Sequence, residues 1–242
     1  MPASSVLDHR LFGDDVLIKD GRIVVKHAAA LASPAMDQLV RVAVFGAGAA
    51  REQARWLIWE LGQQVGVRPA SIHDLYVARG RGRCHGFTVP AINVRMMAYD
   101  TARAIFRTAI KLDAGAFVLE IARSEIAYTD QRPAEYVAVM LAAALREGFR
   151  GPVFIQGDHF QLNAKKFAVA PEPEVDAVKA LAREAVAAVY DAKFEFLFTQ
   201  LAVGGTAKYV TQFVTAPVQH RPAPQGAESL VPAAPDDADL SD

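Results

Sequence analysis

The sequence contains three short apolar segments, TVPAIN at Thr88–Asn93, AFVLEI at Ala116–Ile121 and VFIQGDH at Val153–His159, and polar residues stand at or just after the end of each. The apolar part of each segment is nearly continuous, which leaves no strand face for water. This is typical of a parallel sheet that is covered by helices. The sequence therefore predicts an α/β fold, and a doubly wound sheet and a (β/α) barrel both fit the pattern.

Segments with helical spacing of apolar residues follow each predicted strand. One begins near Asp100, a second runs from Pro133 to Gly148, and a third begins near Pro173. Asp100 suits a helix N-cap, and proline suits the first helical turn. Strand and helix thus alternate three times between residues 87 and 188, which we interpret as one structural unit.

The segments on either side of this unit differ from it. Residues 1–86 are predicted to be an N-terminal extension with a helix over 49–66 and a small β excursion before residue 40. Residues 189–216 are predicted to be helical, with Phe194, Leu197 and Leu201 at helical spacing. Residues 217–242 are rich in Pro, Ala and Asp with few large apolar residues, so we expect a disordered tail.

The composition excludes several classes of protein. The chain has 26 Lys plus Arg against 27 Asp plus Glu, so no excess of positive charge favours nucleic acid. One cysteine, Cys84, excludes an internal disulfide and suits a reducing compartment. Neither a secretory signal nor an apolar run long enough to span a bilayer is visible. We expect a soluble cytoplasmic protein that contacts neither membrane nor nucleic acid.

Polar side chains gather where the three predicted strands end. The carboxyl ends of parallel strands meet at one edge of a sheet, where α/β proteins place their functional groups. Asp158 next to His159 is the most specific candidate for a functional site, because a carboxylate and an imidazole from one turn can transfer a proton or bind a metal. The candidates at the three strand ends are Asn93 and Arg95, then Glu120, Arg123, Ser124 and Glu125, then Asp158, His159 and Gln161.

The stretch from Val89–Asn93, through Ala116–Tyr128, to Gly151–His159 resembles the first part of class II, zinc-dependent fructose-bisphosphate aldolases. The resemblance covers roughly residues 87–188. It implies a partial TIM-barrel-type (β/α) sheet of about three βα units with a helical C-terminal segment. It also implies a lyase of glycolysis whose substrate is a phosphorylated sugar, a ketose, and which reversibly cleaves a C–C bond of that sugar.

The resemblance also implies roles for individual residues. Asp158 would be the catalytic acid/base at the hydroxyl next to the cleaved bond, and His159 would bind Zn²⁺. The zinc would polarise the ketose carbonyl. Asn93 would lie beside the substrate. Ser124 falls near the family's phosphate-binding serine, although it is offset along the chain.

Two features depart from the family pattern. Gly157 precedes and Phe160 follows the Asp-His pair, where the family has a larger residue before it and a small one after it. A catalytic zinc also needs three protein ligands, and the six histidines offer no second ligand beside His159. Eight strand–helix units of this length would need roughly 270 residues. We therefore expect a truncated chain with an incomplete site, which a deletion near Ala188–Val189 would explain.

Three alternatives remain open from the sequence. An aldolase-derived domain without catalysis would act through self-association or partner binding, because an open sheet exposes its edges; a homo-oligomer is expected in either case. The segment Val42–Ala50 has a strand-like run and glycines that suit a nucleotide-binding turn. Lys165 or Lys166 would serve Schiff-base aldol chemistry if buried.

Overall fold

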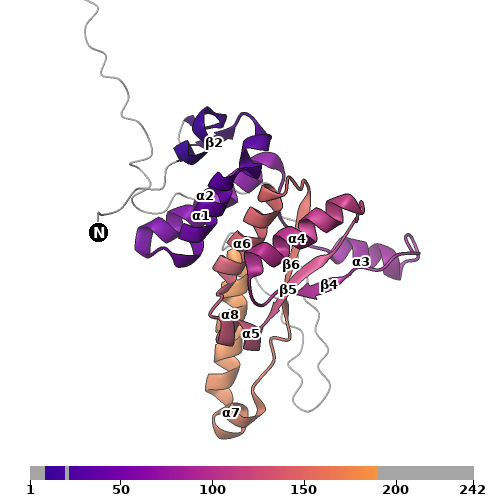
Figure 1. The fold of residues 1–242 in the computed structure, drawn as a ribbon. Helices are drawn as coiled ribbons and strands as arrows, with labels where there is room; N and C mark the ends of the chain where they lie inside the picture. Colours follow the sequence, from indigo (N-terminus) through magenta and orange to yellow (C-terminus); the bar gives the residue numbers. More distant parts are fainter. Residues whose placement is uncertain (1–8, 20–21, 190–242) are drawn as a thin grey trace, which may run out of the picture.

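The computed structural model describes residues 9–19 and 22–189 (Figure 1). Two 3-10 helices and a hairpin of two strands come first, followed by a mixture of helices and four further strands. The helices are η1 (His9–Asp15), η2 (Ala28–Ala32), α1 (Pro34–Phe45), α2 (Gly48–Val65), α3 (His73–Gly80), α4 (Ala98–Lys111), α5 (Arg123–Thr129), α6 (Pro133–Arg146), α7 (Ala164–Val169) and α8 (Pro171–Val189). The strands are β1 (Val16–Lys19), β2 (Arg22–Val25), β3 (Arg68–Ala70), β4 (Ala91–Asn93), β5 (Val118–Ala122) and β6 (Pro152–Asp158).

The main sheet has four strands in the order β3-β6-β5-β4, and all neighbours are parallel. The parallel α/β fold expected from the sequence is therefore confirmed. Strands β4, β5 and β6 are neighbours in the order in which they occur in the chain, and α4, α6 and α8 follow them. The fourth strand, β3, was not predicted, and it lies beyond β6 at the edge of the sheet. Strands β1 and β2 form a separate antiparallel hairpin, in line with the small β excursion expected there.

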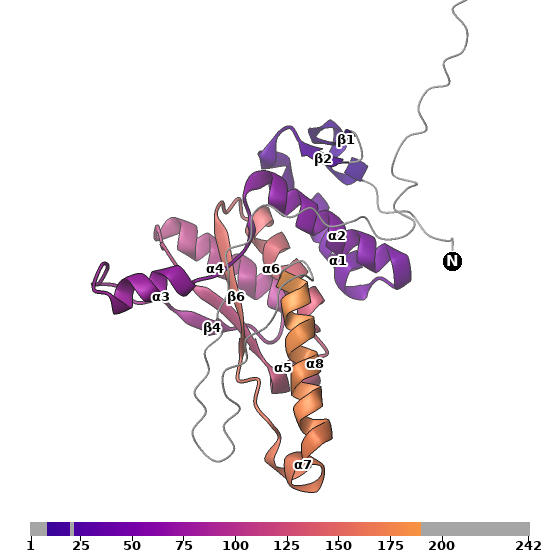
Figure 2. The ribbon, with the colours of Figure 1, turned by 180° about the vertical axis from the view of Figure 1, so that it is seen from behind.

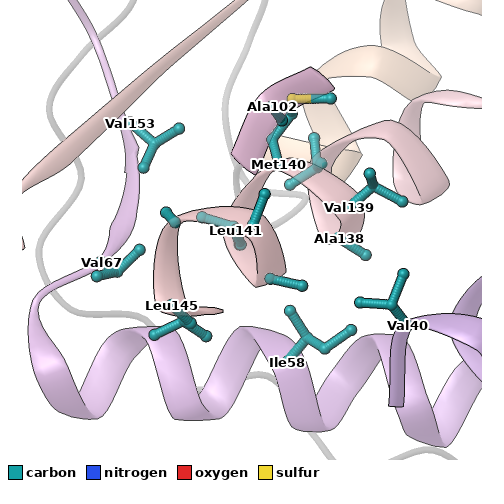
Figure 3. Close-up of a cluster of buried hydrophobic side chains, with 14 of the residues drawn as sticks. Val40, Ile58, Val67, Ala102, Ala138, Val139, Met140, Leu141, Leu145 and Val153 are labelled. Carbon is teal, nitrogen blue, oxygen red and sulfur yellow. The ribbon is translucent and has the colours of Figure 1, made fainter. Parts of the chain in front are cut away.

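Helix α6 lies at the centre of the packing and is buried almost all round. Pro133 stands at its first turn, and every residue from Tyr136 to Leu145 is buried. Helices α1, α2, α4 and α8 all pack against it, as do strands β3 and β6. Several of its residues are alanines, whose small side chains let neighbouring helices approach closely. Figure 3 shows residues of α1, α2, α4 and β6 around α6, among them Val40, Ile58, Ala102 and Val153, with Leu141 of α6.

The two faces of β6 differ in burial, which corrects the expectation that no strand has a face near water. Val153 and Ile155 are buried, whereas Phe154, Gln156 and Asp158 are only half-buried. Because side chains alternate along a strand, these two sets point to opposite faces. One face therefore packs into the core with α6, and the other carries polar side chains.

The N-terminal segment shares this core. Helices α1 and α2 pack on α6, and β3 pairs with β6. The boundary expected between residues 86 and 87 thus runs through one sheet and one core. The helix predicted over 49–66 is confirmed as α2. The helix predicted over 189–216 and the tail predicted over 217–242 lie outside the described residues, except for Val189 at the end of α8.

The nucleotide-binding interpretation of Val42–Ala50 was wrong. Its apolar run is the end of helix α1, which stops at Phe45, and Gly46 to Gly48 join two helices. A phosphate-binding turn of that class needs a strand before it. Met36, Leu39, Val40 and Ala43 are buried at helical spacing, so burial on α6 and α2 outweighs the strand preference of the valines. Within the described residues, no helix is both long and apolar enough to cross a bilayer.

A close backbone approach at Gly62 directs α2 into strand β3. The helix ends at Val65 and is followed by Gly66, whose φ is 77°, and the N–H of Val67 donates to the carbonyl oxygen of Gly62 at 2.9 Å. A Cβ atom on Gly62 would lie 2.4 Å from the carbonyl oxygen of Val67.

We predict that Gly62→Ala lowers the free energy of unfolding by about 1–3 kcal/mol, because the added methyl meets backbone that cannot move cheaply. The control is Gly80→Ala, another helical glycine, where an added Cβ meets nothing within 4 Å. There the stability should stay the same or rise by up to about 1 kcal/mol. Urea unfolding of both variants checks this, and equal stability of Gly62→Ala and wild type would contradict it.

Candidate functional site

The parallel register places three polar side chains in one row across the sheet. Asn93 of β4 is paired with Glu120 of β5, and Glu120 is paired with Gln156 of β6. Two residues further along β6, Asp158 lies opposite Ala122 at the end of β5. Residues paired in register point to the same face. The row and Asp158 therefore share the half-buried face of the sheet near its carboxyl edge.

Asn93 joins the ends of all three strands. Its side-chain Nδ2 donates to Oδ2 of Asp158 at 3.0 Å and to Oε2 of Glu125 at 3.2 Å. Asn93 ends β4, Glu125 lies just after β5, and Asp158 ends β6. Two of the predicted site residues, Asn93 and Asp158, are thus brought into direct contact. Both amide hydrogens are used, so the amide fixes the spacing of two carboxylates.

Glu125 is buried and held in its charged form. Its Oε2 accepts from the backbone N–H of Ala122 at 2.8 Å, and its other oxygen forms an ion pair with Arg95. Burial alone would raise the pKa of this carboxyl. The hydrogen bonds from Ala122, Arg95 and Asn93 outweigh burial, so the pKa lies below its usual value.

Glu120 has the opposite character. It is buried, and its Oε2 accepts a hydrogen bond from Nε2 of Gln156 at 2.5 Å. Burial raises its pKa, and the nearby negative charge of Asp158 adds to this effect, although the bond from Gln156 works against it. Beneath it, the hydroxyl of Tyr136 on α6 donates to the backbone oxygen of Glu120 at 2.9 Å. A carboxyl with a raised pKa beside Asp158 suits proton transfer.

His159 lies at the surface directly after β6. Its Nε2 is 3.0 Å from Oδ1 of Asp158. Its φ is 48°, a left-handed conformation that non-glycine residues adopt at a cost. Gly157 and Phe160, which both depart from the aldolase pattern, are in direct contact here. The ring of Phe160 packs so closely over Gly157 that a Cβ on that residue would lie 2.7 Å from a ring carbon.

The described residues do not supply a full set of zinc ligands. Asp158 and His159 are adjacent candidates, but within residues 9–19 and 22–189 no group of three or more His, Cys, Asp or Glu side chains is arranged to hold a metal. A catalytic zinc takes three protein ligands. Within the described residues, Asp158 and His159 alone therefore do not complete the three-ligand set that the zinc expected from the resemblance would need.

Ser124 and the two lysines lie away from this network. Ser124 is exposed in the first turn of α5, and among the described contacts no hydrogen bond joins it to Asn93, Asp158 or His159. Lys165 and Lys166 are exposed on α7, at the start of α8 (Figure 2). A Schiff-base lysine needs burial to lower its pKa, and neither lysine has that burial.

Glu120 and Glu125 were among the candidates expected at the end of the second strand, but no role was assigned to them, and Gln156 was not singled out. The signal for Glu120 was present, because it is a carboxylate inside an otherwise apolar strand. Such a residue must find a partner when the strand is buried. Its partner depends on the register between β5 and β6, which the sequence does not show.

Comparison of the chain with protein-family models, with curated proteins and with solved structures gave no match. The function proposed below therefore depends on the site geometry and on the resemblance described from the sequence.

We predict that Glu120→Gln and Glu147→Gln change the pH dependence of stability in opposite directions. The pKa of Glu120 is raised, so its protonated form is favoured by folding, and wild type should lose stability relative to Glu120→Gln as pH rises above 4.5. The pKa of Glu147 is lowered by hydrogen bonds from Arg107 and Arg103, which outweigh burial. Wild type should therefore lose its advantage over Glu147→Gln as pH falls below 4.5.

Urea unfolding between pH 3.5 and 8 measures both differences. Each variant is the control for the other, because both remove a carboxylate but with opposite pKa shifts. Parallel pH trends for the two variants would contradict the burial assigned to Glu120.

Proposed function

We propose that the chain is a class II aldolase-like lyase that reversibly cleaves a phosphorylated ketose of the fructose-bisphosphate type, with Asp158 as its acid/base. The observation that carries the proposal is the Asn93 amide, which bonds both Asp158 and Glu125 where three parallel strands end. This arrangement holds the half-buried carboxylate of Asp158 at the carboxyl ends of the parallel strands, which is where parallel α/β folds usually place catalytic groups.

The chemistry of aldol cleavage needs a base at one hydroxyl. A base takes the proton from the hydroxyl next to the bond that breaks, and that carbon becomes an aldehyde. The bonding electrons remain on the other fragment as an enediolate, which must be stabilised and then protonated. Asp158 is suited to the first step, because Asn93 and His159 orient its two oxygens. Glu120, with its raised pKa, is a candidate source of the returning proton.

We also propose that the sheet is part of a (β/α) barrel of the TIM type. In support, β4, β5 and β6 are sequential neighbours followed by α4, α6 and α8, and the polar residues face away from the α6 side. In such barrels the helices cover the outer face, and the inner face carries the site.

Zinc and the phosphate contact of Ser124 remain predictions from the resemblance. Because the described residues provide fewer than three zinc ligands, no step of the mechanism above is assigned to the metal. His159 is the first ligand to test. Cytoplasmic location and the absence of nucleic-acid or membrane partners likewise remain predictions.

The test is cleavage of fructose 1,6-bisphosphate, with and without added Zn²⁺, by the full chain and by Asp158→Asn. We expect triose phosphate from wild type and a kcat lower by about 10²–10⁴-fold in the variant, since it removes the acid/base. The control is Asp130→Asn, which changes the same residue type at an exposed position after α5. Zinc per chain, measured beside His159→Ala, shows whether the metal binds. No triose phosphate from wild type under either condition would overturn the proposal.

A second candidate is a domain that acts by self-association without catalysis. One observation favours it: within the described chain, β3 and β4 each have only one strand partner, so both edges of the sheet are open. Met96 and Met97, just after β4, are 74% and 73% exposed. Open edges and exposed apolar side chains favour association with a second copy.

We predict a homo-oligomer at micromolar concentration that is weakened by Met96→Ser/Met97→Ser, because these changes remove apolar surface from the β4 edge. Light scattering coupled to size-exclusion chromatography measures the mass. Val169→Ser is the control, since Val169 is as exposed but lies on α7. A monomer at all concentrations would remove this candidate.

A further inference from the structure

An ion pair between Arg123 and Glu174 joins two helices beside the site. Arg123 is the first residue of α5, directly after β5, and Glu174 lies in the first turn of α8. Nη1 of Arg123 is 2.5 Å from Oε1 of Glu174, and Glu174 is 4% exposed. Helices α5 and α8 lie side by side in both Figure 1 and Figure 2. The charge of Glu174 is thus kept from water by one arginine and its surroundings.

Both partners also hold the loop that follows β6. Nη1 of Arg123 donates to the backbone oxygen of Gln161 at 2.8 Å. The backbone N–H of Asn163 donates to the same Oε1 of Glu174 at 2.7 Å. Gln161 and Asn163 lie within five residues of Asp158. The ion pair therefore holds the loop that follows Asp158, the proposed acid/base.

The backbone between Asp158 and the first of these anchors, Gln161, is tightly turned. His159 has a φ of 48°, and the N–H of Gln161 donates to the backbone carbonyl oxygen of His159 at 2.8 Å. A left-handed non-glycine residue persists only where its surroundings determine its conformation. Asn163 continues the restraint, because its side-chain oxygen caps α7 by accepting from the N–H of Lys166 at 3.1 Å.

Glu174 differs from an ordinary helix-capping carboxylate. A capping side chain accepts from N–H groups of its own helix, whereas Glu174 directs its carboxylate to Arg123 and to Asn163, both outside α8. The Arg123 hydrogen bond, followed by that from Asn163, lowers the pKa of Glu174 to about 2, so Glu174 stays charged at neutral pH.

We infer that Arg123 and Glu174 are a positioning pair: together they fix the turn that presents Asp158 and His159 at the strand ends. The consequence for catalysis rests on the proposed function. The restraint on the loop stands on the contacts alone. The two residues act as one unit, so loss of either releases the loop as much as loss of both.

The experiment compares Arg123→Gln, Glu174→Gln and the double variant in the full chain. Trypsin reports on the loop, because Lys165 and Lys166 lie just beyond Asn163 on α7. The matched control is Glu184→Gln on the same helix α8, which breaks the ion pair of Glu184 with Arg132 without touching the loop. Thermal unfolding of each variant is recorded beside the nicking rate.

We expect Arg123→Gln and Glu174→Gln each to speed cleavage at Lys165 and Lys166 by about tenfold or more, because a charge-assisted hydrogen bond that opposes local opening is lost. The double variant should be nicked no faster than either single variant, as coupled partners show non-additive effects. Where wild type cleaves the ketose, kcat should fall by about tenfold to a hundredfold with little change in KM.

Unchanged nicking in both single variants, or equal acceleration in Glu184→Gln, would overturn the inference. Additive acceleration in the double variant would also overturn it, since the residues would then act separately. Faster nicking with an unchanged kcat in an active protein would overturn the effect on catalysis. If wild type cleaves no ketose, the proposed function fails, and the nicking rates alone still decide whether the pair holds the loop.

Discussion

The burial of α6 on nearly every side is the constraint on which the other elements depend. A helix that is apolar all round must be covered all round, and α1, α2, α4 and α8 together with β3 and β6 supply that cover. Its alanines let these elements come close, while Tyr136, Met140 and Leu141 fill the space between them. Tyr136 also connects this core to the site, because its hydroxyl bonds the backbone of Glu120. The position of the polar row is therefore set by the same helix that organises the core.

The polar edge of the sheet holds carboxylates in contrasting environments. Glu125 is bonded by a backbone N–H and by Arg95, so its charge is stabilised. Burial raises the pKa of Glu120, so its proton is retained to higher pH even though the hydrogen bond from Gln156 works against this. Neighbouring carboxyls with pKa values pushed apart are the arrangement that lets one group donate a proton while another stays charged. Asp158 belongs to the same network, since Asn93 bonds both Asp158 and Glu125, and the strand of Asp158 is paired with that of Glu120.

The strands β4, β5 and β6 and the helices after them could be predicted from the sequence, because apolar runs and helical spacing there are unambiguous. Strand β3 could not, since Arg68, Pro69 and Ala70 show no strand pattern and are paired only because β6 lies beside them. Helix α1 was misread because its valines favour strands in isolation. At the site, Asn93 and Asp158 were expected at one edge, and they are in contact. The partners of Glu120 and Glu174 depend on register and on helix packing, which no local pattern records.

The place of β3 has a consequence for how the chain folds during synthesis. Arg68 pairs with Pro152 and Ala70 with Phe154. The first strand of the sheet to be synthesised, β3, can therefore pair only after the last strand, β6, has been made. Until β6 emerges, β3 has no strand partner. The apolar faces of α1 and α2 likewise lack the completed core around α6 that covers them. Contacts this distant in sequence form slowly, because a long loop must close first. The nascent chain is therefore most exposed to aggregation during the synthesis of residues 70–158.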